Sequence, residues 1–595
     1  MKNSLRQKFR SFILHPSSFI LVFCAFALAP LSAPGYFIYA HDARHSVYFL
    51  QMFDASLRDG AWYPRWAADM TFGYGYPLWL ILAPLPFFVG EAFHLVGFDF
   101  VSAVKIVDGL AVFCSALTMY LFASRVLGRN AGFVAAIAYV YIPYHLVDLY
   151  VRAAQAELVS FVFPPLVCLA FYELAMTRRT RYIAIAALSY AAFILSHISM
   201  AVIFTPMIGL YILFVMVIGS RRQKAEGRNL LQRAADCLLP AAFSILLALG
   251  IAAVFWLPIL FEQRYLTSDP LIGGFFNYRK HFLNANQLLS PFWGHGYAGE
   301  NGTDQFSLQL GLIPTLLAIV ALGATARTRG AIRAHIVLFA TITLLIVFSM
   351  LPISVRLWEP FAAVIAFVQF PWRLLVVTTF TLAFLSGAAL YAFAEDASKR
   401  APTLAIALFL VIASYVYTQP QHTDAVFNYE TQMEFEIKYG ELLGDTVWLT
   451  GERPKDSPLV EQYVRGEKLK KAIALDDGAT VETIRYGGQS TDLRVDAPAP
   501  TRVLVYTHYF PGWTATLAPA VTASAGVIDS QRVELEPCGA QGLIRVRVPA
   551  GSHVVRLRFE DTPIRQIGAV ISGLSLLVAA GMIIKLRGSN REAEI

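Results

Sequence analysis

The stretch from His41 to His45 places a carboxylate beside imidazole and guanidinium groups, directly after the first long apolar run. A carboxylate held next to a substrate hydroxyl can act as a general base, which is the role we expect for Asp42. His41, Arg44 and His45 are then candidates to bind the substrate. Asp42 is equally well placed to cap an amphipathic helix that runs to about residue 57, which is a purely structural role.

His41 and His45 are four residues apart, a spacing that puts two metal ligands on one helix face. A zinc hydrolase of this kind also needs a glutamate after the first histidine and a third ligand. The sequence supplies neither at the required place, so zinc is not the favoured interpretation.

A second cluster, DLYVRAAQAE, contains Asp148, Arg152 and Glu157 between two apolar runs. Ionisable side chains so close to lipid indicate a functional site by default. We therefore expect Glu157 to be catalytic, and Asp148 and Arg152 to bind substrate. A charge network that ties two helix ends together explains the same residues equally well.

Four more cationic or imidazole side chains are candidates for substrate binding: Lys105, Arg264, His295 and Arg373. Arg264 and His295 belong to a long loop, 262–306, that mixes basic and aromatic residues. Such a mixture suits a phosphate with a sugar stacked on a ring. It also suits an aromatic belt at a membrane interface, and both interpretations remain open.

The composition indicates the kind of protein that must position these residues. Of 595 residues, 56% are hydrophobic and only 15% are charged, and the net charge is +7. Soluble proteins carry about 25% charged residues, so the composition excludes a disordered chain and a soluble multidomain α/β enzyme. It predicts a polytopic helical membrane protein, in which basic residues mark topology rather than a nucleic-acid partner.

Runs of about 20 apolar residues are long enough to cross about 30 Å of hydrocarbon. We predict twelve transmembrane helices on this basis. They lie at about 18–40, 101–124, 130–147, 157–176, 182–197, 199–219, 236–261, 307–326, 334–351, 373–394, 402–418 and 566–586. His197 falls in a tight turn between two of them, where we expect it to cap or tie helix ends.

The run Tyr76–Gly97 decides the topology. If it crossed the membrane, the later basic clusters would lie outside, against the positive-inside rule. It also contains three prolines, Glu91 and His94, which are unfavourable at mid-bilayer. We therefore predict a re-entrant or juxtamembrane segment on the outer side, with both chain termini in the cytoplasm.

Three parts follow from this topology. Residues 1–418 form a transmembrane domain whose first outer loop is 41–100. Residues 419–565 are more polar and form a β-rich, sandwich-like extracytoplasmic domain, and residues 566–595 are the last helix with a cytoplasmic tail.

Strict alternation of apolar and basic residues at 543–548 and 553–560 predicts two strands. A hairpin between them would place Val546 opposite Val555 on the buried face. It would also place arginines opposite each other on the other face, which is unfavourable without an acidic or anionic neighbour.

Several motifs, taken in order, resemble known membrane proteins. GAWYPRWAADMTFGYGYPL, YVRAAQAE, ILSHIS and FVQFPWRLL resemble the bacterial membrane proteins labelled "6-pyruvoyl-tetrahydropterin synthase-related". YTHYFPGWTATL and VRVPAGSHVVRLRFEDTPIRQIGAVIS look like the C-terminal part of YfhO-like membrane proteins. Both groups look like members of the GT-C superfamily of membrane glycosyltransferases.

The resemblance implies a GT-C-like fold in the bacterial cytoplasmic (inner) membrane and a polyprenyl-phosphate-linked sugar as donor. The acceptor would be a glycan, a lipid or a protein. Asp42 matches the acid of the first outer loop, and Glu157 or Asp148 matches a second-loop acid of some members. The sequence lacks a first-loop Asp-x-Asp pair. A divalent cation (Mg or Mn), where one binds, would use Asp42 and Glu157.

The expected function is therefore transfer of a sugar at the extracytoplasmic face. Two other classes remain as alternatives, a transporter or flippase and a non-catalytic assembly protein for cell-envelope glycans. A transporter usually places its polar residues near mid-bilayer on broken helices in repeated halves. Here the charged candidates fall at predicted helix ends.

Overall fold

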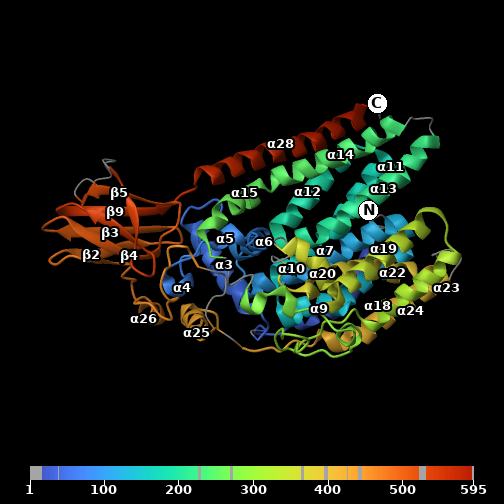
Figure 1. Cartoon of the computed structure of the whole chain (residues 1–595), viewed down its shortest axis with the longest axis horizontal. Helices are drawn as coiled ribbons and strands as arrows, with labels where there is room; N and C mark the ends of the chain where they lie inside the picture. The colour runs from blue at the N-terminus through green and yellow to red at the C-terminus, as the bar shows by residue number, and fades with distance from the viewer. Residues whose placement is uncertain are drawn as a thin grey trace, which may run out of the picture.

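The computed structural model describes residues 16–592 except 38, 226–229, 268–272, 363–367, 394–399, 425, 440–444 and 521–530. The basic residues that predict a cytoplasmic N-terminus precede residue 16 and lie outside this set. Long helices form one body, and the strands form a second body at one side of it (Figure 1). The last helix, α28 (Pro563–Glu592), leaves the strands and runs back along α14 and α15.

The other helices follow one another along the chain in the same order as the predicted apolar runs. They are α2 (Pro16–Leu28), α3 (Ala43–Arg58), α4 (Met70–Gly73), α5 (Leu78–Ile81), α6 (Leu85–Leu95), α7 (Phe100–Leu127), α8 (Arg129–Tyr141), α9 (Pro143–Val147), α10 (Gln155–Ser160), α11 (Phe163–Thr177), α12 (Arg181–Ser196), α13 (Ile198–Ala225), α14 (Leu230–Ile251), α15 (Ala253–Glu262), α17 (Ala285–Leu289), α18 (Leu312–Gly323), α19 (Gly330–Met350), α20 (Val355–Trp358), α22 (Leu375–Ala388), α23 (Leu390–Phe393), α24 (Arg400–Ser414), α25 (Tyr429–Tyr439) and α26 (Val460–Val464).

Each of the twelve predicted spans contains a helix, but the count of twelve spans is not confirmed. Within the described residues, seven helices are long and apolar enough to cross a membrane, or up to nine if each of two bent pairs is one span. The first bend, of 44°, separates α8 from the segment that starts at Pro143. Ile142 is extended there because a residue that precedes proline is sterically driven out of the α region.

The run Tyr76–Gly97 forms no single long helix. It breaks into α5 and α6, and α6 has 11 residues, or about 16 Å of helix. This length cannot cross about 30 Å of hydrocarbon, which agrees with the predicted non-spanning segment. α6 packs against α3 and α7.

The two ends of the helical body carry different residues, and α7 connects them. Near its start, the Val104 carbonyl accepts a hydrogen bond from Gln155; at its end, the Leu127 carbonyl accepts one from Tyr391. About 35 Å of helix separates these two carbonyls. The Leu127 end, which we call the basic end, also holds Arg125, paired with Glu173. We call the Gln155 end the polar end, and the positive-inside rule predicts that it faces outward.

The strands form a two-sheet sandwich, as the sequence indicated. One sheet has the order β1-β4-β8-β7 and the other β2-β3-β9-β5-β6. A single apolar core, with Val503 and Val546 from one sheet and Leu493 and Val555 from the other, lies between them. The strands are β1 (Ala472–Ala474), β2 (Thr480–Tyr486), β3 (Ser490–Ala497), β4 (Thr501–His508), β5 (Trp513–Pro519), β6 (Gln531–Val533), β7 (Leu535–Cys538), β8 (Leu543–Val548) and β9 (Gly551–Phe559).

The predicted β8–β9 hairpin is wrong. β8 pairs with β4 and β7, whereas β9 pairs with β3 and β5 in the other sheet. The turn between them crosses from one sheet to the other, so Val546 and Val555 are both buried but are not a cross-strand pair. Arg545 faces Glu536 on β7 and forms an ion pair with it, and Arg556 faces Asp492 on β3, so the expected pairing of these two arginines does not occur.

Buried arginines join the sandwich to the helical body. Arg565, at the start of α28, is fully buried and donates to Glu262 at 2.9 Å and to the Pro511 carbonyl at 2.9 Å. Arg65, from the loop between α3 and α4, is also buried and donates to Asp561 at 2.9 Å. These bonds fix the sandwich to both α15 and the loop between α3 and α4.

A second junction lies where the turn between β2 and β3 meets the end of α3. The Asp59 carboxylate accepts hydrogen bonds from the Gln489 N–H and the Ser490 hydroxyl, both at 2.8 Å. A Cβ at Gly488 would lie 2.5 Å from the backbone nitrogen of Ser56, so glycine permits this close approach. The sandwich therefore holds the C-terminal end of α3 directly.

Candidate functional site

The polar end contains a turn of π-helix, Asp148–Arg152, between α9 and α10. Ala153 ends this turn with a left-handed φ of +48°, and the chain becomes helical again at Gln155. π-Turns inside helical segments often mark functional sites. This break brings Asp148 and Arg152 together with Glu157, although the three residues come from two helical pieces.

The Arg152 guanidinium lies between two carboxylates. Its Nη1 pairs with Asp148 and lies 2.8 Å from Oε2 of Glu157. The side chains of Arg152, Asp148 and Glu157 are 5%, 0% and 1% exposed. The Tyr144 hydroxyl donates to Glu157 at 2.8 Å and accepts from Arg152 at 3.2 Å. The predicted charge network is therefore present: Oε1 of Glu157 accepts from Tyr144, and Oε2 is ion-paired with Arg152 without a hydrogen bond.

A second arginine approaches this network from the turn that precedes α22. Arg373 donates through Nη1 to the Gln369 side chain at 2.8 Å, and its charge acts on Glu157 and Asp42. Its buried Nε has no acceptor among the described residues. The neighbouring Trp372 places its ring 5.1 Å from the Arg152 guanidinium. Two arginines and an aromatic face thus line one side of the site.

Asp42 lies at the rim of the network. Its backbone N–H donates to the Arg152 carbonyl at 2.7 Å, and the N–H of His41 donates to Val151 at 3.1 Å. Asp42 occupies the capping position of α3, but its side chain makes no capping hydrogen bond. The carboxylate therefore does not cap the helix, and it remains half-buried and within electrostatic reach of Arg152 and Arg373.

His41 connects this rim to the long loop 262–306. Its Nε2 lies 2.9 Å from the Gly296 carbonyl, and its ring stacks on Tyr297 with centroids 4.9 Å apart. Burial lowers the pKa of His41, so the ring is neutral at neutral pH and donates to Gly296. His295 precedes Gly296 and reaches the same region through this loop.

Four predicted substrate-binding residues lie away from the network. Arg44 and His45 pack on the ring of Phe435, at 5.4 and 5.2 Å. Lys105 donates to the Ala33 carbonyl at 2.7 Å, and Arg264 lies over its neighbour Tyr265. These contacts do not bring the four side chains to Arg152.

The described side chains do not fit a divalent cation held by the protein. They contain no group of three or more His, Cys, Asp or Glu residues close enough to hold a metal ion. Glu157 is taken up by Tyr144 and Arg152, and His41 and His45 have different ring partners. The chemistry of the site is therefore derived from the protein's own side chains.

Sequence reasoning missed three members of the site, Tyr144, Gln369 and Trp372, and assigned His197 only a capping role. His197 accepts from the Met200 N–H at 3.4 Å, which is such a cap, and its ring also lies within electrostatic reach of Glu157. The available signal was the FVQFPWR motif, which contains Gln369 and Trp372 as well as Arg373.

Comparisons with known proteins agree with a membrane protein. Residues 81–412, more than half of the chain, match the family described as "6-pyruvoyl-tetrahydropterin synthase related domain; membrane protein". No curated protein matches the sequence.

Two solved structures can be compared at the level of the fold. The mycobacterial arabinofuranosyltransferase AftD is 15% identical, with a TM-score of 0.43 over 75% of this chain and 31% of its own. The oligosaccharyltransferase AglB of Archaeoglobus fulgidus, solved with an inhibitory peptide and a dolichol-phosphate, is 12% identical, with a TM-score of 0.37 over 74% of this chain and 60% of its own. The chain thus spans about a third of the length of AftD.

Proposed function

We propose, on the premise that the chain belongs to the membrane-protein family described as "6-pyruvoyl-tetrahydropterin synthase related domain", that it is a membrane glycosyltransferase. It transfers a sugar from a polyprenyl-phosphate donor to a glycan, lipid or protein acceptor at the extracytoplasmic face. One observation carries the proposal. Asp42 holds a half-buried carboxylate, without a capping bond, within electrostatic reach of Arg152 and Arg373.

The proposed reaction is a displacement at C1 of the donor sugar. The acceptor hydroxyl gives its proton to Asp42 and its oxygen bonds to C1. The bond between C1 and the phosphate oxygen breaks, and the electron pair leaves with the phosphate. Arg373, whose Nε lacks an acceptor among the described residues, is placed to bind the departing phosphate.

The charges of the site suit this step. When Asp42 takes the proton of the acceptor hydroxyl, its carboxylate loses one negative charge in the same step in which the phosphate gains one. Because the neighbouring Asp148, Arg152 and Glu157 are almost fully buried, this exchange avoids a large change of charge beside a medium of low dielectric constant.

Glu157 acts differently from Asp42 in this proposal. Its Oε1 accepts from Tyr144 and its Oε2 forms an ion pair with Arg152, so it acts as a positioning residue for Arg152, whose carbonyl accepts from the Asp42 backbone N–H. Asp148 holds the same guanidinium from the other side. Loss of either carboxylate is expected to move Arg152 and, through its carbonyl, Asp42.

The test is sugar transfer by the purified protein in lipid nanodiscs, supplied with polyprenyl-phosphate sugars and with glycan and lipid acceptors. We expect transfer by the wild type and a fall in kcat of about a hundredfold or more for Asp42→Asn at unchanged Tm. Glu461→Gln, an exposed control, should transfer normally. Absence of turnover with every donor, or full activity of Asp42→Asn, would contradict the proposal.

The membrane orientation needs its own measurement. Reporter fusions at residues 100 and 225 should show residue 100 outside and residue 225 in the cytoplasm. A cytoplasmic residue 100 would place the polar end on the inner face and would exclude an extracytoplasmic reaction.

A further inference from the structure

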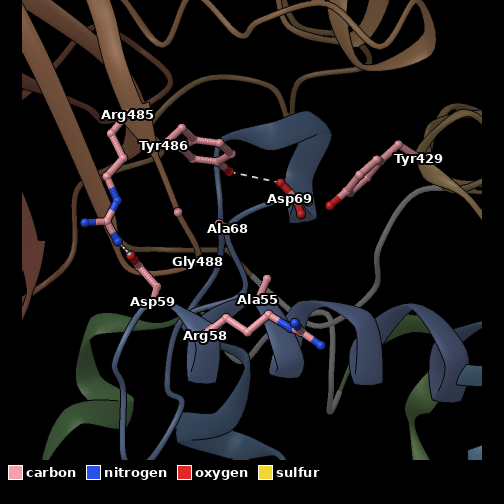
Figure 2. Close-up of a pocket in the computed structure, with 10 residues that line it drawn as sticks. Ala55, Arg58, Asp59, Ala68, Asp69, Tyr429, Arg485, Tyr486 and Gly488 are labelled. Carbon is pink, nitrogen blue, oxygen red and sulfur yellow. Dashed lines mark hydrogen bonds and ion pairs between the residues drawn. The ribbon is translucent and has the colours of Figure 1, made fainter. Parts of the chain in front are cut away.

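A cavity of about 310 Å³ lies at the far end of α3, away from Asp42 (Figure 2). It is bounded by α3, by the first outer loop, by the start of α25 and by the turn between β2 and β3. Its lining residues are Ala55, Arg58, Asp59, Ala68, Asp69, Tyr429, Arg485, Tyr486, Gly487 and Gly488. This volume is at the lower end of the range of small-molecule sites, about 300–1,000 Å³.

Asp69 presents an incompletely used carboxylate to this cavity. The residue is only 5% exposed, and its Oδ1 accepts from the Tyr463 hydroxyl at 2.6 Å and from the Tyr486 hydroxyl at 2.9 Å. Oδ2 has no donor among the described residues and, in Figure 2, points into the space above Ala55 and Arg58. This oxygen reaches the open space of the cavity, where a ligand hydroxyl can replace water as its donor.

The charges in the cavity are balanced. Arg485 pairs with Asp59 at 2.5 Å, and Arg58 pairs at 2.5 Å with Asp54 on the same helix. The four charged residues of the lining, Arg58, Arg485, Asp59 and Asp69, sum to zero. The cavity does not favour a polyanion, because both of its arginines already pair with carboxylates. It does not favour a metal cation either, because the Asp59 oxygens already bind Arg485, Gln489 and Ser490.

Tyr429 supplies an aromatic surface at the opposite wall. The residue is 48% exposed, and its hydroxyl points toward Asp69 in Figure 2. Sugars combine an apolar C–H face, which packs on an aromatic ring, with hydroxyls that donate to carboxylates. The lining thus offers both contacts that a neutral sugar requires.

We infer that this cavity is a subsite for a neutral sugar unit of a carbohydrate acceptor. The inference rests on the proposed function, and it narrows the acceptor to an oligosaccharide. α3 has 16 residues and starts next to Asp42, so the cavity lies about 24 Å from the carboxylate that activates the acceptor. One chain of several sugar units can occupy both places, with its reacting end at Asp42 and its distal unit at Asp69 and Tyr429.

Binding is measured first, in the Asp42→Asn background, so that no turnover occurs. Neutral gluco-, manno-, galacto- and arabino-oligosaccharides and a uronate-containing oligosaccharide are titrated into the protein in nanodiscs by calorimetry. We expect a neutral oligosaccharide to bind, with Kd raised about tenfold by Tyr429→Ala and by Asp69→Asn. Trp62→Ala, which removes an exposed aromatic outside the cavity, and Glu461→Gln should leave Kd unchanged.

Transfer kinetics then separate this inference from the proposed function. With Asp42 intact, KM should fall as the acceptor lengthens, and Tyr429→Ala should abolish that dependence without changing kcat. The subsite is refuted if no neutral oligosaccharide binds, if only the uronate binds, or if neither Tyr429→Ala nor Asp69→Asn weakens binding. If binding depends on both Tyr429 and Asp69 but no sugar is transferred, the sugar subsite is supported and the proposed glycosyltransferase activity is refuted.

Discussion

Removal of Arg152 is the sharpest test of the network at the polar end. Arg152→Met takes away the only described cation that touches both Asp148 and Glu157. The two carboxylates are 0% and 1% exposed, so water cannot replace the lost partner. Breaking a buried ion pair from one side costs about 3–5 kcal/mol, because an uncompensated charge stays buried.

The chain contains a matched control for this substitution. Arg465 and Glu461 have the same spacing of four residues as Arg152 and Asp148, but their side chains are 61% and 79% exposed. Exposed pairs of this kind contribute about 0–1 kcal/mol. Arg465→Met therefore breaks an ion pair of the same residue types and the same spacing, but one that is exposed to solvent.

The assay is thermal unfolding of each variant in the same detergent. Arg152→Met should lower the apparent Tm by several degrees, and Arg465→Met should not. Adding Asp148→Asn and Glu157→Gln to Arg152→Met should recover part of the loss, because the buried charges are then gone. Equal Tm values for the two single variants, or no recovery in the triple variant, would refute the reasoning.

Three further predictions concern the sandwich and its junctions. Burial lowers the pKa of Lys471 from 10.5 to about 7, so between these pH values the folded state binds fewer protons than the unfolded chain. The free energy of unfolding should therefore rise with pH in that window, by up to about 1.4 kcal/mol per pH unit. When unfolding is followed across pH, this contribution should vanish in Lys471→Met and persist in Lys468→Met, which changes an exposed lysine. Arg565→Met should release the sandwich from α15, lower the free energy of unfolding by about 3 kcal/mol and speed limited proteolysis between the two bodies. An unchanged cleavage rate would contradict the role of Arg565 in that junction. Gly488→Ala should destabilise by about 1–3 kcal/mol through its clash with α3, whereas Gly573→Ala, with open space around it, should be neutral or stabilising in the same melt.

The helices were predictable because hydropathy is read over about 20 residues, and each apolar run does contain one. Their bends were not, since the break at Ile142 depends on a local steric effect that a hydropathy average conceals. The π-turn that carries Asp148 and Arg152 follows that break, after the short helix α9. The count of twelve spans is not confirmed, since the described residues contain seven candidate spans, or up to nine with the two bent pairs.

The sequence indicates which kinds of residue form the candidate site, but it only partly predicts which of them lie together. Asp42, Arg152 and Glu157 do meet, because each follows or precedes an apolar run on the same predicted side. Lys105 and Arg264 lie elsewhere, because hydropathy does not fix which way a helix face turns.

The strands show the same limit. Alternation with a period of two identified 543–548 and 553–560 correctly, since it defines which face of a strand is buried. It carries no information about the partner strand, so β8 and β9 were paired although they belong to different sheets. The turn at Pro549 reads like a hairpin and is a crossing between sheets.

The helix α3 acts as a spacer of fixed length between two anchored ends. At one end Asp42 is held by the Arg152 carbonyl, and at the other Asp59 is held by the β2–β3 turn. One inserted residue would rotate one end by about 100° and move it by about 1.5 Å, so both anchors could not be kept. Any rocking of the sandwich would also pass along this helix as a rigid rod to Asp42. The neighbouring loops can therefore change in length, whereas the sixteen residues of α3 cannot.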